Sequence, residues 1–407
     1  MDHEDKALGR RLREVRAWRQ LSLKETADLA GISFGYLGRI ERGEQPVTSR
    51  ATLEALANAL RIDPGELTGT PYAPSDPVGS DAHAALREVE TALSSLDLGV
   101  DPGVQARPWA ALAAEVDHLN NTLRANADYA ALGAVVPGLL TELHAAYVQQ
   151  PNERQNVLVG LLHTFYSAAV LTKNLGVRGW PVVAARLAED CAQELDRPEW
   201  LGFGIWLRGN VAGAQGRTHQ YGMSVRGIDA LTPHLDCSNA LQAAGMLHLN
   251  AALAAAAQSD ADTTRDHLRE ATELASRLPE RHDNFGYLYF GPDNVGIWRV
   301  SLGTELGQGA KVAEIARHVR PDALPLPAKA RRAVFYADLG RALASEKRTR
   351  EQGIRSLIKA ESIAPQKIRN NIFVRETVAD LLRQARRDAG GRDLRGLAWR
   401  MGVSPTG

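Results

Sequence analysis

The sequence has 407 residues, of which 44% are hydrophobic and 24% are charged. This composition is ordinary for a soluble globular protein, and the length allows two or more domains. We find no apolar run of about eighteen residues that would span a bilayer. Met1–Lys6 is acidic and polar, unlike a signal peptide. Membrane and secreted proteins are therefore disfavoured, and we expect a cytoplasmic protein with no membrane contact.

The net charge is zero, but the charges are unevenly distributed. Residues 1–69 hold equal numbers of basic and acidic side chains, and residues 70–328 are acidic. Residues 329–407 hold 18 Lys+Arg against 8 Asp+Glu. We expect this basic tail to contact either DNA or the acidic middle of a partner subunit. Cys191 and Cys237 are expected to be reduced core residues, with a regulatory disulfide as the alternative.

Five short helices are predicted in the first 69 residues. Ser22 and Glu25 have the spacing of a capping box, and Ser33 caps the next helix. Gly31 and Gly43 suit the left-handed turns that end these two helices. Two short helices joined by a glycine-containing turn make a helix-turn-helix. The five predicted helices cover residues 8–20, 23–30, 34–42, 50–60 and a last turn from Pro64.

This stretch resembles the lambda-repressor/Cro-like (XRE) family of DNA-binding domains. The resemblance rests on small, capping and apolar positions that agree over about sixty residues. A five-helix bundle without a DNA role would show the same apolar spacing but would not need this turn. The matching residues are Leu12, Arg13, Arg16, Ala27, Ala30-Gly31-Ile32-Ser33, Tyr36-Leu37, Arg39-Ile40-Glu41-Arg42-Gly43, Leu53, Leu56, Ala57 and Leu60.

The resemblance implies that the third helix enters the major groove of a double-stranded DNA operator. Phe34, Gly35 and Leu23 depart from the family, which usually has polar or basic side chains at these positions. Few groups are left for bidentate base contacts, and Arg39 is the best candidate. Arg39 or Arg42 pairing with Glu41 or a neighbour is the alternative. The candidate DNA-binding residues are Arg13, Arg16, Ser22, Lys24, Ser33, Phe34, Gly35, Tyr36, Gly38, Arg39 and Arg42.

Residues 70–80 are rich in proline and glycine and are predicted to be a linker. A connecting helix is expected over 81–98, followed by a break at Asp101-Pro102-Gly103. From Trp109 onward, apolar helices alternate with short turns, and no alternating strand pattern occurs. The fold is therefore predicted to be all-α, with residues 81–407 forming a second domain.

Residues 336–365 resemble a tetratricopeptide repeat, with Gly340 and Gly353 among its small positions. Residues 248–271 form a second such unit. Second helices of successive pairs are predicted to begin near Pro181, His219, Asp262, Lys311 and Thr349. Their spacing exceeds the usual period of about 34 residues. We therefore expect a degenerate tetratricopeptide-like solenoid, with a non-repetitive helical domain as the alternative.

Peptide-sensing regulators of Gram-positive bacteria, which resemble this arrangement, use asparagines on the first helices to grip a peptide backbone. An amide offers a donor and an acceptor for that purpose. The aromatic segment 279–298 is expected either to line a ligand pocket or to fill the concave face. Asparagines that cap helices or face solvent are the alternative. The candidate ligand-binding residues are His163, Tyr166, Trp206, Arg208, Asn210, Asn250, Tyr287 and Asn294.

No catalytic arrangement is recognisable: the sequence lacks a phosphate-binding loop, a zinc-type His or Cys pattern and a nucleophile turn. We therefore expect no enzyme, cofactor or metal. The preferred interpretation is a homodimeric transcriptional regulator whose second domain senses a peptide or small molecule. An adaptor that binds a protein partner, with DNA binding secondary, is the alternative.

Overall fold

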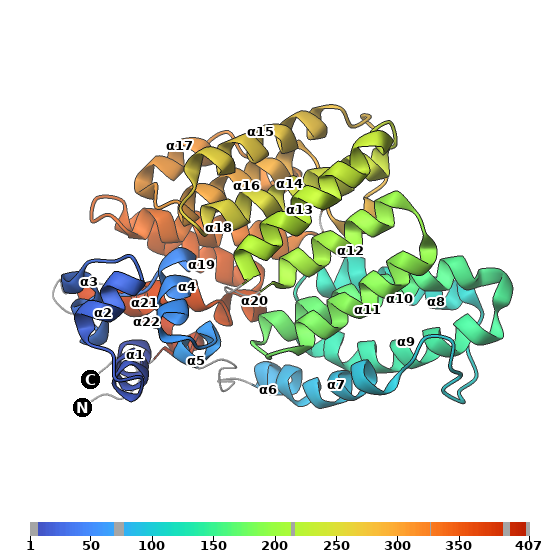
Figure 1. The fold of residues 1–407 in the computed structure, drawn as a ribbon, viewed down its shortest axis with the longest axis horizontal. Coiled ribbons are helices and arrows are strands. Elements are labelled where there is room, and N and C mark those ends of the chain that lie inside the picture. The colour runs from blue at the N-terminus through green and yellow to red at the C-terminus, as the bar shows by residue number, and fades with distance from the viewer. Residues whose placement is uncertain (1–6, 69–76, 213–215, 326, 386–390, 404–407) are drawn as a thin grey trace.

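The structure is a computed structural model, and it describes residues 7–68, 77–212, 216–325, 327–385 and 391–403. All regular elements in these ranges are helices (Figure 1). The all-α prediction is confirmed. The chain forms two parts: residues 7–68, which we call the headpiece, and the described residues from 77 onward, which we call the array.

The headpiece contains five helices around one small core. The predicted capping box is present: the Glu25 amide donates to Ser22 Oγ at 3.1 Å, and the Ser22 amide donates to Glu25 Oε2 at 2.7 Å. Gly31 and Gly43 adopt φ values of +64° and +69° where the second and third helices end, as predicted. The helices are α1 (Ala7–Trp18), α2 (Leu23–Leu29), α3 (Phe34–Glu41), α4 (Arg50–Leu60) and α5 (Pro64–Thr68).

The linker prediction over 70–80 falls mostly on residues outside the described ones. Helix α6 (Pro77–Ala84) begins inside the predicted linker. Helix α7 (Leu86–Ser95) then follows, so the connecting helix expected over 81–98 is two helices. Helix α8 (Trp109–Asp117) begins at Trp109, where helical periodicity was predicted to resume.

The array consists of antiparallel helix pairs that follow one another along a curved path (Figure 1). Every predicted second helix begins within about two residues of its expected position, because proline, capping and glycine signals are local. Helix α9 (Tyr129–Gln149) precedes the pairs. These are α10 (Arg154–Asn174) with α11 (Trp180–Leu195), α12 (Pro198–Val211) with α13 (Arg217–Leu231), α14 (Ser238–Ala256) with α15 (Ala261–Ser276), α16 (Pro292–Glu305) with α17 (Val312–Ala316), and α18 (Lys329–Ala344) with α19 (Arg350–Ile363).

Helices α18 and α19 cross closely at two glycines. A Cβ on Gly353 would lie 2.7 Å from the Ala344 amide nitrogen and 2.8 Å from the Gly340 carbonyl oxygen. Both neighbours are backbone atoms of α18, so only a shift of the helix would make room. The close crossing explains why small residues occupy these positions.

We expect Gly353→Ala to destabilise the protein by about 1–3 kcal/mol, because overpacking outweighs the gain in helix propensity. Gly138→Ala in α9 is the matched control, since no atom lies within 4 Å of the added methyl. The control should be neutral or stabilising by about 0.5–1 kcal/mol. Chemical denaturation measures both, and equal effects at the two sites would refute the close crossing.

The curved path closes, so that the last helices meet the first ones. The Ala330 amide donates to the Ala125 carbonyl at 2.7 Å, and Lys367 Nζ donates to Asn174 Oδ1 at 3.1 Å. Gln366 Oε1 accepts from the amide of Tyr129 at 3.0 Å. Helix α20 (Pro365–Arg369) thereby contacts the beginning of α9 and the end of α10. The inner surfaces of the pairs enclose a central space.

Contrary to the expectation that no segment is apolar enough to span a bilayer, helix α9 meets that criterion by length and composition. It also carries Glu142 and His144, and its buried side chains belong to the main core of the array. Its packing against α7 and α10 is that of a core helix.

Buried ion pairs dock the headpiece on the array. Arg217 of α13 binds Glu54 of α4 at 2.7 Å, and both side chains are only 8% exposed. Arg341 of α18 binds Glu305 at 3.3 Å and donates to the Thr48 carbonyl at 2.7 Å. Phe373 of α21 (Ile372–Ala385) completes the headpiece core. The docking surface includes α4, the segment before it and α5, whose Glu66 pairs with Arg178 of the array.

Candidate nucleic-acid interface and ligand cavity

Helix α3 presents its first turn to solvent. Ser33 caps the helix through its Oγ, which accepts from the Tyr36 amide at 3.2 Å. Phe34 is 58% exposed, and Ser33, Gly35 and Arg39 are exposed beside it. No hydrogen bond or ion pair connects these four side chains to the described residues of the array. The predicted groove-facing positions are therefore accessible to a partner.

The arginines of the headpiece have different environments. Arg16 binds Glu41 through two hydrogen bonds of 2.6 and 2.8 Å and is largely buried, so it joins α1 to α3. Arg42 pairs with Glu44 at the surface. Arg39 forms no ion pair with any described residue. The predicted alternative, pairing of Arg39 or Arg42 with Glu41 or a neighbour, is confirmed for Arg42, which pairs with Glu44. It is wrong for Glu41, because Arg16 occupies that carboxylate.

The remaining DNA-binding candidates divide into exposed and structural positions. Arg13 and Lys24 are exposed, whereas Ser22 is used in the capping box. Burial is the main reason that the pKa of Tyr36 is raised, and its side chain is held near Thr52. Gly38 is buried with Leu23 and Arg42 next to it. Their roles in binding DNA remain predictions.

Five of the eight predicted ligand residues line one cavity at the centre of the array. The cavity has a volume of about 200 Å³. Side chains of α10, α12, α16 and α18 form its wall, together with the aromatic segment after α15. The five residues are Tyr166, Trp206, Asn210, Tyr287 and Asn294.

The other three predicted ligand residues lie outside this wall. His163 is buried among the rings of Trp200, Phe203 and Tyr287, and burial lowers its pKa to about 3. Arg208 pairs with Glu189 at 2.8 Å. Asn250 is fully buried and donates to the Trp206 carbonyl at 2.8 Å, which joins α14 to α12. Each of the three is engaged in packing or pairing within the array.

The side chains of the aromatic segment are divided between the core and the cavity wall. Phe285 and Phe290 are buried and fill the core, with Phe285 4.5 Å from the Trp200 ring. Tyr287 and Tyr289 line the cavity, and both adopt positive φ values, of 54° and 53°. The left-handed conformation costs a non-glycine residue roughly 1–2 kcal/mol. Residues held in such strained conformations cluster at ligand sites.

Sequence reasoning missed the basic residues of the cavity: Arg124, Lys173, Arg331 and Lys367. Arg124 belongs to a π-helical turn, η1 (His118–Arg124), that no sequence pattern announced. Burial, together with the charges of Arg331 and Arg124, lowers the pKa of Lys367 to about 8. Desolvation by the surrounding protein, together with the charges of Arg50, Lys367 and Arg217, lowers the pKa of Lys173 to about 7. The Lys173 side chain is still reached by solvent from the cavity.

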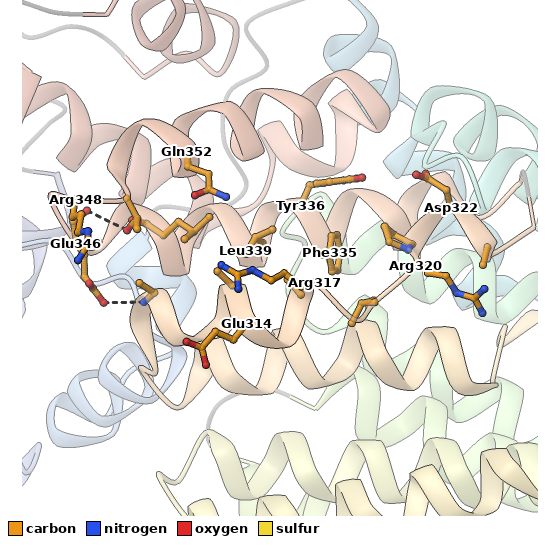
Figure 2. A pocket seen from close by; sticks show the side chains of 18 residues that line it. Glu314, Arg317, Arg320, Asp322, Phe335, Tyr336, Leu339, Glu346, Arg348 and Gln352 are labelled. Carbon is orange, nitrogen blue, oxygen red and sulfur yellow. Dashed lines mark hydrogen bonds between the residues drawn. The ribbon is translucent and has the colours of Figure 1, made fainter.

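A larger hollow of about 930 Å³ lies between α17 and the pair α18/α19 (Figure 2). Acidic and basic side chains alternate along it, among them Glu314, Arg317 and Glu346. Glu346 Oε1 accepts from the Ala310 amide at 2.8 Å. Because its charges are mixed, this hollow lacks the single sign of charge that distinguishes the central cavity.

Comparison with known proteins identifies the headpiece. A family described as "Helix-turn-helix domain" matches residues 7–68. No curated protein matches the chain. The crystal structure of ComR from Streptococcus suis aligns with 96% of this chain and 97% of that chain, with 13% sequence identity and a TM-score of 0.25. Together with the capped turn and exposed α3, the family match shows that residues 7–68 form a helix-turn-helix DNA-binding domain.

Proposed function

We propose that this protein is a cytoplasmic, non-enzymatic transcriptional regulator of the lambda-repressor-like class. Its headpiece binds an operator sequence, and its tetratricopeptide-like array dimerises and binds a peptide or small molecule. The observation that carries the proposal is the exposed first turn of α3 in a helix-turn-helix. In this class the first turn of the recognition helix reaches the base edges in the major groove.

Homodimerisation is part of the proposal because a single headpiece offers few specific contacts. Of the exposed side chains in the first two turns of α3, only Arg39 can make a bidentate hydrogen bond to a base. Two headpieces on half-sites one helical turn apart, about 34 Å, double the number of contacts. Arg10 and Arg13 of α1, and Arg19 directly after it, supply charge for the phosphates.

Coupling between ligand and DNA is proposed to pass through the charges at the docking surface. Lys173 of the cavity is close enough to Arg50 and Arg217 for their charges to lower its pKa. These two arginines also bind Glu305 and Glu54 at the docking surface. The headpiece is proposed to have two arrangements relative to the array. A ligand that changes the charge around Lys173 binds one arrangement more tightly than the other and so increases the population of that arrangement.

We expect Arg39→Ala to weaken operator binding by about 1–3 kcal/mol, or roughly 5- to 150-fold. Electrophoretic shift assays with the DNA upstream of the gene, at several salt concentrations, measure the effect. Arg265→Ala is the matched control, because it removes an equal charge from the exposed surface of α15. Specific binding that survives Arg39→Ala unchanged would count against recognition by α3.

An adaptor function is the second candidate, and one observation favours it. Leu29 and Phe34 are 63% and 58% exposed and lie on neighbouring helices of the headpiece. Adjacent exposed apolar side chains are more typical of protein contacts than of phosphate contacts. Weak, sequence-independent DNA binding, together with loss of a protein partner in Phe34→Ala, would favour the adaptor.

A further inference from the structure

The central cavity has an unusual concentration of positive charge. Four cationic side chains line it: Arg124 from η1, Lys173 from α10, Arg331 from α18 and Lys367 from α20. No Asp or Glu is among the described residues that line it. The four cations lie far apart in the sequence and are brought together only by closure of the array.

Each cation is bound by neutral acceptors. Arg124 Nε donates to Asn120 Oδ1 at 3.0 Å, and Lys173 Nζ donates to Asn210 Oδ1 at 3.1 Å. Arg331 Nε donates to Asn294 Oδ1 at 2.6 Å, and Lys367 Nζ donates to Asn174 Oδ1 at 3.1 Å. Amide oxygens satisfy hydrogen bonds without neutralising charge, so the cavity keeps a net positive charge.

Asp117, Asp128 and Asp338 form their hydrogen bonds and ion pairs with groups other than the four cations, although the charge of Asp338 reaches Arg331 and Lys367. Asp117 accepts from the Tyr287 hydroxyl at 3.1 Å, and Asp128 accepts from the Ala131 amide at 3.2 Å as a helix cap. Asp338 pairs with Arg341 at 2.9 Å. Charges enclosed in a protein are normally paired or bind a charged group. The missing counter-charge is therefore expected from outside the chain.

Unused hydrogen-bond donors belong to the same wall. Arg331 Nη2, Trp206 Nε1, Trp298 Nε1 and the Tyr129 hydroxyl are buried and have no partner among the described residues. Trp206, Trp298 and Tyr129 are each less than 9% exposed. Leaving a buried donor without an acceptor costs roughly 1–3 kcal/mol.

The volume of the cavity and its aromatic side chains limit the size and shape of the uncharged part of the ligand. The Arg124 guanidinium lies 4.0 Å from the Tyr166 ring centroid, and that of Arg331 lies 4.6 Å from the Trp298 ring centroid. The volume of about 200 Å³ is smaller than the roughly 300–1,000 Å³ of most small-molecule sites. The space therefore suits a compact, flat molecule and is too small for a long peptide.

We propose that the central cavity binds a small organic anion, with a carboxylate or phosphate held by Lys173, Arg331 and Lys367 and a flat apolar body against Trp206, Tyr287 and Trp298. This inference rests on the proposed ligand-sensing function and names the chemical class of the effector. Asn210 and Asn294 act as supports that orient Lys173 and Arg331, and not as clamps for a peptide backbone.

The test uses the full-length protein with benzoate, phenyl phosphate and uncharged benzamide as probes. We expect the two anions, but not benzamide, to raise the thermal unfolding midpoint and to give binding heat in titration calorimetry. A stronger response to benzoate identifies a carboxylate ligand, and a stronger response to phenyl phosphate identifies a phosphate. Lys367→Met and Arg331→Met should each weaken binding about tenfold or more, as expected for loss of a charge-assisted hydrogen bond.

Controls separate this proposal from misfolding and from the proposed function. Lys367→Met also loses the hydrogen bond to Asn174 Oδ1, so circular dichroism and the unfolding midpoint without anion must show that this variant keeps its fold. Arg265→Met, which changes an exposed side chain of α15, should bind the anions normally. Equal responses to benzamide and benzoate, full anion binding in Lys367→Met, or binding only of peptides would overturn the proposal. If operator binding depends on Arg39 but neither anion binds, the anion site is refuted and the proposed regulator is not. If the anions bind but the protein binds no operator, the proposed regulatory function is refuted and the anion site is not.

Discussion

Glu54→Ala is expected to weaken docking of the headpiece on the array by about 3–5 kcal/mol, which is two to four orders of magnitude in the docking equilibrium. Glu54 and Arg217 are both almost fully buried, 2.7 Å apart. Removing the carboxylate leaves the Arg217 guanidinium with Gln220 Oε1, at 2.6 Å, as its remaining side-chain acceptor. A buried charge left without a counter-charge is far more costly than an exposed one.

The interface contains its own matched control. Glu66 pairs with Arg178 at 3.3 Å, also between headpiece and array, but both side chains are about half exposed. Glu66→Ala should therefore change docking by less than about 1 kcal/mol. Small-angle scattering and limited proteolysis report separation of the two parts, and chemical denaturation reports the energy. If Glu54→Ala and Glu66→Ala had equal effects, the docked arrangement would be incorrect.

A double variant isolates the cause. Glu54→Leu with Arg217→Met replaces the pair with apolar side chains of similar size. Such replacements of buried pairs are often neutral or stabilising. We therefore expect the double variant to dock nearly as well as the wild type, with each single variant impaired.

The sequence predicted what depends on neighbouring residues. The caps at Ser22 and Ser33, the glycine turns and the beginnings of the second helices are encoded within a few residues, so periodicity and capping locate them. The small residues Gly340 and Gly353 also reveal the close helix crossing, because only a missing Cβ permits it. The positions of the helices and their pairing could therefore be predicted from the sequence.

Contacts between distant segments were not predictable from a single sequence. Glu54 and Arg217 are 163 residues apart, and Lys367 and Asn174 are 193 residues apart. Nothing in the local sequence of Arg331 or Lys367 distinguishes them from the other basic residues of the tail. The tail was expected to face DNA or a partner subunit, yet these two side chains line the internal cavity.

The asparagines illustrate the same limit. Asn210, Asn250 and Asn294 were predicted to hold a ligand because they occur in successive first helices, but Asn210 lies near the end of α12 and Asn294 near the beginning of α16. Asn210 and Asn294 lie at the cavity, where they accept from Lys173 and Arg331. Asn250 is sealed between α12 and α14 by its bond to the Trp206 carbonyl. The role of an amide depends on the donors around it, which only the folded chain determines.

Phe203→Ala is expected to destabilise the array by about 3–5 kcal/mol, the range for truncation of a fully buried phenylalanine. The Phe203 ring is completely buried in α12. Its centroid lies 5.4 Å from that of Trp206, 5.5 Å from Tyr166 and 6.2 Å from Phe285. The contacts with Tyr166 and Phe285 are edge-to-face, and aromatic pairs of this kind add about 0.5–1.5 kcal/mol each to the burial energy.

The same substitution is expected to lower the affinity of the central cavity. A Cβ on Gly286 would lie 2.5 Å from the Phe203 ring, so the backbone that carries Tyr287 rests directly on this ring. Removing the ring leaves that strained segment without support, and Tyr287 and Tyr289 then hold their left-handed conformations less firmly. Chemical denaturation measures the loss of stability, and titration with benzoate measures the loss of affinity.

Phe34→Ala is the matched control for stability, since it makes the same chemical change at a side chain that is 58% exposed. Exposed positions usually tolerate substitution within about 0.5 kcal/mol. The large difference expected between the two variants follows from burial alone, because the deleted atoms are identical. Comparable stability of Phe203→Ala and Phe34→Ala would show that Phe203 does not occupy the centre of the core. The support that it gives to the cavity wall would then have to come from Trp200 and Phe285, whose ring centroids are 4.5 Å apart.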